Sequence, residues 1–286
     1  MRVSVNFQYI LKDREPRDAV MLAKNAGFEA IDFSFLEEPY YAESGFGEDW
    51  YRDLRKIADD HGIVFNQAHA PFSTSFKDPD RTEERFWEVV RSMKHAAILG
   101  IPVTVVHPMQ HLRYCHEGAP EQLFQINMDF YRRLIPYCEE YGVKVALENM
   151  WQYEPKYVIN HSTCSSPTEM IRYFDTLNSP WITCCLDLGH ATLVEDTPAF
   201  IRALGAERLG ALHVHDVDGV HDSHMPPYTG VTDWQQITEA LKDIGYQGDF
   251  TFEVCAWLKK VPMCLHESAL KLLSDSGHHL VKQINE

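Results

Sequence analysis

Six side chains that can bind a metal ion each close an apolar stretch of the sequence. These side chains are His69, His107, Glu148, Asp187, His213 and Glu253. If the fold brought them together, the carboxylates would repel one another and raise one another's pKa. A divalent cation removes that cost, so the pattern indicates a metal centre, and His190 in the segment Asp187-Leu-Gly-His190 adds a further imidazole.

The stretches between these residues alternate between helical and strand patterns. Each helical stretch ends in a residue that tolerates the left-handed backbone of a helix C-cap. These residues are Gly27, Gly62, Gly100, Gly142, Asn178, Gly205 and Gly245. A short apolar run follows each, and a further run opens the chain. Strands are therefore predicted at residues 3–7, 30–33, 63–65, 103–106, 143–147, 182–186, 209–214 and 250–252.

Helix start signals support the same division. Ser166-Pro-Thr-Glu169 is a capping box with proline at the first helical position, and helices are also expected to open at Thr197-Pro198 and Thr232-Asp233. Strands that alternate with helices imply a parallel sheet. Eight strand–helix units with none left over favour one closed (β/α)8 TIM barrel over residues 1–286, rather than an open doubly wound sheet. No Gly-x-Gly-x-x-Gly or P-loop sequence follows the first strand.

In such a barrel, the C-terminal ends of the strands surround one small volume, where the chemistry is expected. Glu148, Asp187, His213 and Glu253 would offer three carboxylates and one imidazole there. That set predicts one divalent cation, with Mn²⁺ favoured and Co²⁺, Mg²⁺ or Zn²⁺ as alternatives. No cysteine closes these strands, which argues against a structural thiolate zinc site.

At these motifs the sequence resembles the xylose isomerase-like barrels, a superfamily of sugar-phosphate isomerases and epimerases that also contains endonuclease four. The local match is His213-Val-His-Asp, continuing through His224-Met-Pro-Pro to Asp233-Trp234. The sequence departs from the family segment at Tyr228-Thr229, where glycine and an acidic residue are usual. The strand order extends the resemblance over essentially the whole chain.

The resemblance implies an enzyme in which one cation, held by Glu148, Asp187, His213 and Glu253, binds a carbonyl and a neighbouring hydroxyl of a sugar. Glu148 and Glu253 would be base and acid in proton transfer through a metal-stabilised enediolate. Return of the proton to the opposite face gives epimerisation, and return to the neighbouring carbon gives aldose–ketose isomerisation. Both outcomes stay open.

Further residues are assigned to the substrate in the same way. His69, His107 and His190 would either hydrogen-bond sugar oxygens or orient ligand carboxylates. Arg113 would meet a phosphate or carboxylate, or lie in solvent. Trp151 and the nearby Tyr153 would form a wall beside the sugar ring, or pack between loops.

Two alternatives remain within the same resemblance. A leaving group one carbon further on would turn the deprotonation into a β-elimination, giving a dehydratase or lyase of a keto-sugar or keto-glycoside. In an endonuclease four-like enzyme, three zinc ions would be bound by nine ligands, which here include Asp222 and His224. Against nucleic acid stands a formal net charge of −16, from 42 acidic and 26 basic residues, which repels a phosphate backbone.

Composition sets the remaining expectations. The 286 residues, 45% of them apolar, can bury a large core. No basic, apolar leader opens the chain, no apolar run reaches the length of a membrane span, and the seven cysteines form no C-x-x-C pair. A cytoplasmic enzyme is expected, acting on a small-molecule carbohydrate without nucleic acid or membrane partners. The resemblance implies a homo-oligomer.

Overall fold

A computed structural model describes residues 1–154 and 158–286, and all structural statements concern these residues. Eight parallel strands form one sheet in the order β10-β1-β2-β3-β4-β5-β8-β9. The strands are β1 (Val3–Asn6), β2 (Ala30–Ser34), β3 (Val64–His69), β4 (Val103–Val106), β5 (Lys144–Glu148), β8 (Ile182–Asp187), β9 (Leu209–His213) and β10 (Phe250–Phe252). The predicted eight strands are therefore all present.

The sheet closes between its first and last strands. Val214, directly after β9, forms a parallel bridge with Phe252 of β10. The Val214 N–H donates to the carbonyl of Thr251 at 2.8 Å, and the Glu253 N–H donates to the carbonyl of Val214 at 3.1 Å. The fold is thus the expected TIM barrel.

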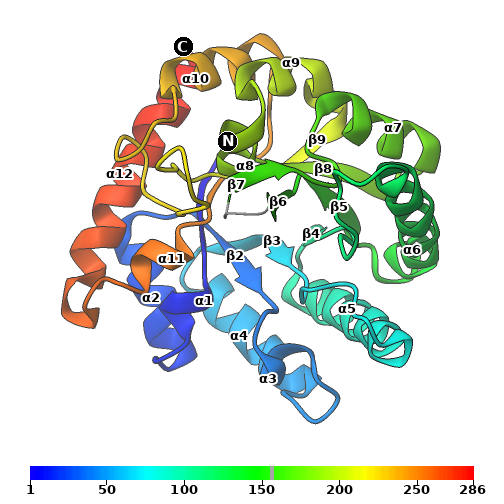
Figure 1. Ribbon diagram of the computed structural model, residues 1–286. Helices are drawn as coiled ribbons and strands as arrows, with labels where there is room; N and C mark the ends of the chain where they lie inside the picture. Colours follow the sequence, from blue (N-terminus) through cyan, green and yellow to red (C-terminus); the bar gives the residue numbers. More distant parts are fainter. Residues whose placement is uncertain (155–157) are drawn as a thin grey trace.

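Helices surround the barrel (Figure 1). They are α1 (Gln8–Leu11), α2 (Pro16–Ala26), α3 (Glu38–Tyr41), α4 (Glu48–Asp60), α5 (Pro79–Leu99), α6 (Ala119–Tyr141), α7 (Pro167–Leu177), α8 (Leu188–Val194), α9 (Thr197–Arg208), α10 (Trp234–Asp243), α11 (Cys255–Leu258), a 3-10 turn (Met263–Leu265) and α12 (His266–Asn285). In the part of the chain that the structure describes, no helix has the length and apolar character needed to cross a membrane.

Left-handed residues end four helices as predicted. Gly27, Gly100, Gly142 and Asn178 are the C-caps of α2, α5, α6 and α7 and have φ values between 42° and 101°. Gly62 and Gly245 are also left-handed but lie one residue beyond the C-caps His61 and Ile244, and Gly205 lies inside α9, at a kink with a φ of 68°.

At the start of α7, the Ser166 hydroxyl accepts from the Glu169 N–H, so the predicted N-cap is present. The Glu169 carboxylate accepts from the Tyr114 hydroxyl and the Cys164 N–H rather than from the Ser166 N–H, so the second bond of the capping box is replaced. Helix α9 begins at Thr197 as expected, although the side chain that caps it belongs to Asp196.

Two elements near the strand ends were not predicted. An antiparallel hairpin, β6 (Trp151–Glu154) with β7 (Val158–His161), follows β5 directly. The short helix α8 follows β8, and its N-cap is Asp187, whose carboxylate accepts from the His190 N–H at 2.7 Å. Both elements therefore place residues beside the predicted metal ligands.

Polar side chains fill part of the barrel interior. The Ser4 hydroxyl donates to Asn66 Oδ1 at 2.7 Å, and the Asn66 amide donates to Thr251 Oγ1 at 3.1 Å. The Thr251 hydroxyl donates in turn to Gln67 Oε1 at 3.2 Å. All four residues are buried. Since buried polar groups are costly unless they are paired, this network fixes β1, β3 and β10 relative to one another.

Glu169, in the first turn of α7, gives the first testable prediction. Burial raises its pKa to about 7, although the Tyr114 hydroxyl and the Cys164 N–H both donate to Oε2 at 2.9 Å. Because the pKa of this carboxyl group is higher in the folded than in the unfolded state, its contribution to stability is fully present below pH 4.5. That contribution is lost as the pH rises through about 7. From pH 5 to pH 8, we expect this group to lower the free energy of unfolding by on the order of 2 kcal/mol.

Urea unfolding at both pH values measures the effect. Glu169→Gln should lack this part of the pH dependence, so it should gain stability relative to wild type at pH 8. Glu267→Gln, on an exposed face of α12, serves as the control and should follow wild type at both values. An equal difference between Glu169→Gln and wild type at pH 5 and pH 8 would contradict the prediction.

Candidate metal centre and its pocket

Four predicted ligands meet at the C-terminal end of the barrel. Glu148 ends β5, Asp187 ends β8, His213 ends β9, and Glu253 follows β10. All four are buried, and one ligand atom from each lies within 4.8 Å of the others. His213 Nδ1 is 2.8 Å from Glu148 Oε1, 3.4 Å from Glu253 Oε2 and 4.0 Å from Asp187 Oδ2. We call these four residues the central cluster.

Opposing effects set the charges in the central cluster. Burial alone would raise the pKa of Glu148, but His213 and His107 outweigh it and hold that pKa well below its usual range. Burial alone would lower the pKa of His213, but Cys185, Glu253 and Glu148 raise it well above its usual value. One imidazolium cannot balance three carboxylates, so the central cluster keeps an excess of negative charge.

The central cluster fits a divalent cation. Three carboxylates and one imidazole make up a common donor set for such ions. Donors within 4.8 Å of one another suit an ion bound at about 2.0–2.4 Å from each. Since a ligating imidazole must be neutral, a bound cation would replace the proton that the carboxylates draw onto His213.

A second group of donors surrounds the other oxygen of Glu148. His107 Nε2 lies 2.9 Å from Glu148 Oε2, and His69 Nε2 lies 3.5 Å from the same oxygen. The two imidazole nitrogens are 3.0 Å apart. His69 ends β3 and His107 follows β4, so the structure brings both predicted histidines to the central cluster.

A third group lies on the other side of Asp187. Asp222 Oδ2 is 3.4 Å from His190 Nε2 and 3.2 Å from His224 Nε2. His215 completes this group, and its Nε2 lies 3.0 Å from Asp187 Oδ2. The nearby carboxylate of Asp222 raises the pKa of His224 to about 9, against the lowering effect of burial.

Backbone carbonyls orient three of these imidazoles. Nδ1 of His69, His190 and His224 lies 2.7, 2.8 and 2.7 Å from the carbonyl oxygens of Ala70, Asn149 and Glu253, respectively. A carbonyl oxygen accepts only, so each Nδ1 carries a proton and donates it. Nε2 is then the atom presented to the neighbouring carboxylates, as in histidines that ligate metals.

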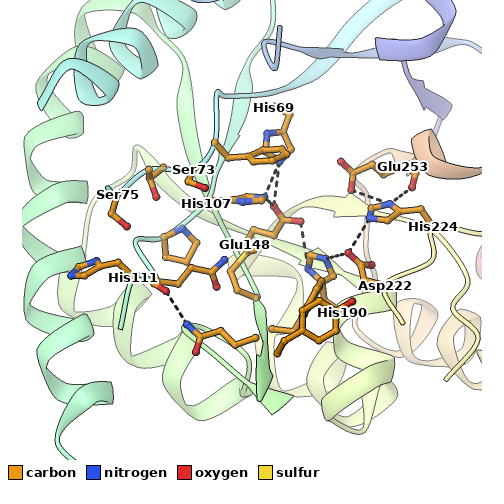
Figure 2. Close-up of a pocket in the computed structure, with 18 residues that line it drawn as sticks. His69, Ser73, Ser75, His107, His111, Glu148, His190, Asp222, His224 and Glu253 are labelled. Carbon is orange, nitrogen blue, oxygen red and sulfur yellow. Dashed lines mark hydrogen bonds and ion pairs between the residues drawn. The ribbon is translucent and has the colours of Figure 1, made fainter. Parts of the chain in front are cut away.

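A pocket with a volume of about 520 Å³ opens onto these groups. Glu148 and Glu253 line it, whereas Asp187 and His213 do not and are completely buried. Figure 2 shows Glu148 in the middle of the pocket, with His190, Asp222, His224 and Glu253 on one side. The two glutamates therefore belong both to the central cluster and to the pocket wall.

Most of the residues predicted to contact the substrate line this pocket, but one of them does not. His69, His107, His190 and Trp151 line it, and so does Tyr153. Arg113 lies in the loop after β4, but it is exposed and is not one of the described lining residues. Arg113, the positively charged side chain that the sequence assigned to the substrate, therefore lies outside the pocket.

Two buried residues next to the central cluster had no predicted role. His215 belongs to the predicted strand-end segment His213-Val-His-Asp, and side chains two apart on a strand share a face, which accounts for its position beside His213. Asp32 of β2 has an oxygen 4.0 Å from His213 Nε2, and burial raises its pKa to about 6. It is the one acidic residue in the predicted strand at 30–33. A Cβ on Gly189 would lie 2.0 Å from His215, so glycine lets α8 approach this imidazole.

Asp216 organises the loop that carries Asp222 and His224. Its carboxylate accepts from the N–H groups of Gly230 and Thr232, each at 3.0 Å, and from the indole of Trp234 at 3.2 Å. Within this loop, Tyr228 has a φ of 69°, in the region that favours glycine. The backbone thus adopts a glycine-like conformation where the sequence departs from the family segment.

Known proteins are similar to this chain in sequence or in fold. The family model described as "Xylose isomerase-like TIM barrel" matches residues 20–267. An uncharacterised protein of Methanocaldococcus jannaschii is 28% identical over 192 residues, 65% of this chain and 62% of that protein. A D-psicose 3-epimerase of Enterocloster bolteae is 31% identical over 43% of this chain and 37% of its own. A mannonate dehydratase of Enterococcus faecalis is 27% identical over 49% and 41%. The chain thus spans about half the length of these curated relatives.

Solved structures resemble the chain over its full length. A zinc-binding protein named IOLI superposes with a TM-score of 0.80 at 19% identity, covering 99% of both chains. A D-tagatose 3-epimerase-like protein gives a TM-score of 0.78 at 19% identity and covers 100% of this chain and 98% of its own. At these identities, the structures establish the shared fold.

Proposed function

Because the chain belongs to the xylose isomerase-like TIM barrel family, we propose that it is a divalent metal-dependent sugar isomerase or epimerase. The observation that carries the proposal is the double placement of Glu148 and Glu253. Both offer ligand atoms to the central cluster, and both line the pocket in which a substrate would lie. A carboxylate in this position can act on a C–H bond next to a carbonyl that the cluster holds.

The chain's own residues supply the proton transfer. Glu148 reaches the pocket from β5 and Glu253 from β10, so they approach a bound sugar from separate strands. The low pKa of Glu148 keeps it ionised, as a base must be. The other glutamate can donate a proton of its own to the opposite face of the same carbon, which gives the epimer, whereas protonation of the neighbouring carbon gives the isomer. A cation held by the central cluster would polarise the carbonyl and stabilise the negative charge that deprotonation creates.

We propose Mn²⁺ as this cation, with Co²⁺, Mg²⁺ and Zn²⁺ as alternatives. Three carboxylates to one imidazole is a set rich in hard oxygen donors, which supports manganese over zinc. The presence of zinc in the IOLI structure supports the alternative. We also propose a homo-oligomer, on the basis of family membership alone.

Metal removal tests the proposed function. Protein loaded with Mn²⁺ is incubated in D₂O with D-fructose or D-psicose, and proton NMR follows deuterium entering next to the carbonyl and the appearance of the epimer. Dialysis against EDTA should lower the exchange rate by about 100-fold or more, and added Mn²⁺ should restore it. Buffer with Mn²⁺ and no protein gives the background rate. Exchange that survives complete metal removal would contradict the proposal.

A nuclease is a second candidate because the structure also assembles the two outer groups, His69–His107–Glu148 and His190–His215–Asp222–His224. An endonuclease four-like enzyme would bind three zinc ions per chain and cleave DNA at an abasic site. The net charge of −16 and the lack of lysine or arginine among the described lining residues disfavour it. Metal analysis together with cleavage of abasic DNA would establish this alternative.

Elimination is an alternative outcome of the same deprotonation, and the similarity to a mannonate dehydratase supports this alternative. If a leaving group stands one carbon beyond the deprotonated position, its loss yields an unsaturated keto-sugar. The exchange experiment separates the two reactions, because elimination gives a dehydrated product and no epimer.

A further inference from the structure

The pocket continues well beyond the central cluster. On the side away from Asp222, His224 and Glu253, it is lined by Ser73, Ser75 and His111 (Figure 2). Phe72, which precedes Ser73 and stacks on His107, also lines the pocket. We call these four residues the distal wall. They come from the loops after β3 and β4, whereas the central cluster comes from β5, β8, β9 and β10. The proposed proton transfer uses none of them.

The pocket is larger than a single sugar requires. Even at the about 30 Å³ that a water molecule takes up in the liquid, the twelve non-hydrogen atoms of a hexose would need only about 360 Å³. The pocket has about 520 Å³, which exceeds this generous allowance for one hexose. A monosaccharide at the central cluster would leave the distal wall uncovered.

The distal wall has the surface chemistry of a sugar subsite. Phe72 is 47% exposed and stacks on His107, with ring centres 4.8 Å apart and planes 10° apart. Its outer face is thus an apolar platform at the pocket, of the kind on which the C–H face of a sugar ring can pack. Ser73, Ser75 and His111 add hydrogen-bonding groups that can meet hydroxyls.

Charge disfavours an anionic group at this wall. The described lining residues include the carboxylates Glu148, Asp222 and Glu253 but neither lysine nor arginine. His190 and His224, whose pKa values are raised, lie beside Asp222 on the opposite side of the pocket, so a phosphate or carboxylate at the distal wall would meet no lysine or arginine and no such imidazolium. The pocket therefore suits a neutral ligand.

We propose that the distal wall binds a second, neutral sugar unit, and that the substrate is a two-unit saccharide or glycoside. The unit that carries the carbonyl lies at the central cluster, and the second unit packs on Phe72 and hydrogen-bonds Ser75 and His111. The position of the carbonyl unit rests on the proposed function, whereas binding of the second unit does not require catalysis.

Matched ketoses test the proposal by calorimetric titration of Mn²⁺-loaded protein. D-Fructose is compared with its 6-phosphate and with two neutral disaccharides, 6-O-glucosyl-fructose and 4-O-galactosyl-fructose. At least one disaccharide should bind about tenfold more tightly than D-fructose, because the second ring adds an aromatic stack and hydrogen bonds. The 6-phosphate should bind more weakly than D-fructose. Disaccharides that bind no better than D-fructose, or a preferred phosphate, would overturn the proposal.

Variants locate the effect. Phe72→Ala should reduce the affinity ratio of disaccharide to D-fructose by about tenfold, and Ser75→Ala or His111→Ala should reduce it by about threefold. Phe46→Ala is the matched control, since Phe46 is 38% exposed and stacks on Trp50 away from the pocket. An unchanged ratio in all three distal-wall variants would place the second unit elsewhere and refute the assignment.

Deuterium exchange separates the two proposals. Tight disaccharide binding without exchange into any ketose would refute the proton-transfer function and leave the subsite established. Exchange into D-fructose without any preference for disaccharides would support the function and refute the subsite.

Discussion

Replacing Glu148 or Glu253 by glutamine is expected to lower the rate of solvent deuterium exchange into the sugar by about 1,000-fold. Glutamine has nearly the same shape and keeps a carbonyl oxygen for the cation, but it can neither accept nor return the proton. Both glutamates line the pocket, so each loss acts directly at the substrate. NMR in D₂O with Mn²⁺-loaded variants measures the rate.

Controls separate loss of a proton carrier from loss of fold or metal. Circular dichroism should match wild type, and both variants should retain Mn²⁺ at raised concentrations of the ion. Glu139→Gln, exposed on the outer helix α6, should exchange at the wild-type rate. Exchange that persists in both pocket variants would eliminate glutamate-mediated proton transfer as the mechanism.

The second large effect is expected at His213. Its Nδ1 is the single nitrogen of the central cluster and faces all three carboxylates. His213→Leu keeps much of the volume but removes both the donor atom and the positive charge that partly balances those acids. We expect the dissociation constant for Mn²⁺ to rise by about 100-fold, and the metal-free protein to unfold at a lower temperature.

A buried histidine elsewhere provides the matched comparison. His95 on α5 is 6% exposed and stacks on Tyr51, outside all the described donor groups. His95→Leu should therefore bind Mn²⁺ as wild type does. Titration calorimetry measures both variants, and wild-type affinity in His213→Leu would remove this residue from the proposed ligand set.

Much of the fold could be predicted because its signals are local. Left-handed C-caps at Gly27, Gly100 and Asn178 depend on the residue type at one position, and so does the N-cap at Ser166. Strand ends then followed from the apolar runs between helices. The resemblance to xylose isomerase-like barrels, based on the segment from His213 to Trp234, is confirmed by the family match.

The remaining features of the fold and the site depend on tertiary contacts, which the spacing of residues along the sequence does not reveal. Hairpin β6–β7 consists of two short strands that are stable only because they pack over the barrel, so its pattern resembled a loop. The carbonyl of Glu253 orients His224, and the carbonyl of Asn149 orients His190, through tertiary contacts alone. The residues of the distal wall were not predicted to line the pocket, because serines in loops usually lie in solvent.

Closure of the barrel also determines when the metal centre can form. His213 and Glu253 flank the bridge between Val214 and Phe252, so the contact that closes the ring also brings these two ligands together. A chain growing from the ribosome has Glu148, Asp187 and His213 well before Glu253 is made. Until β10 inserts between β1 and β9, the chain has an open sheet and an incomplete ligand set. The proposed cation would thus bind tightly only to the finished barrel, and it would in turn oppose separation of β9 from β10.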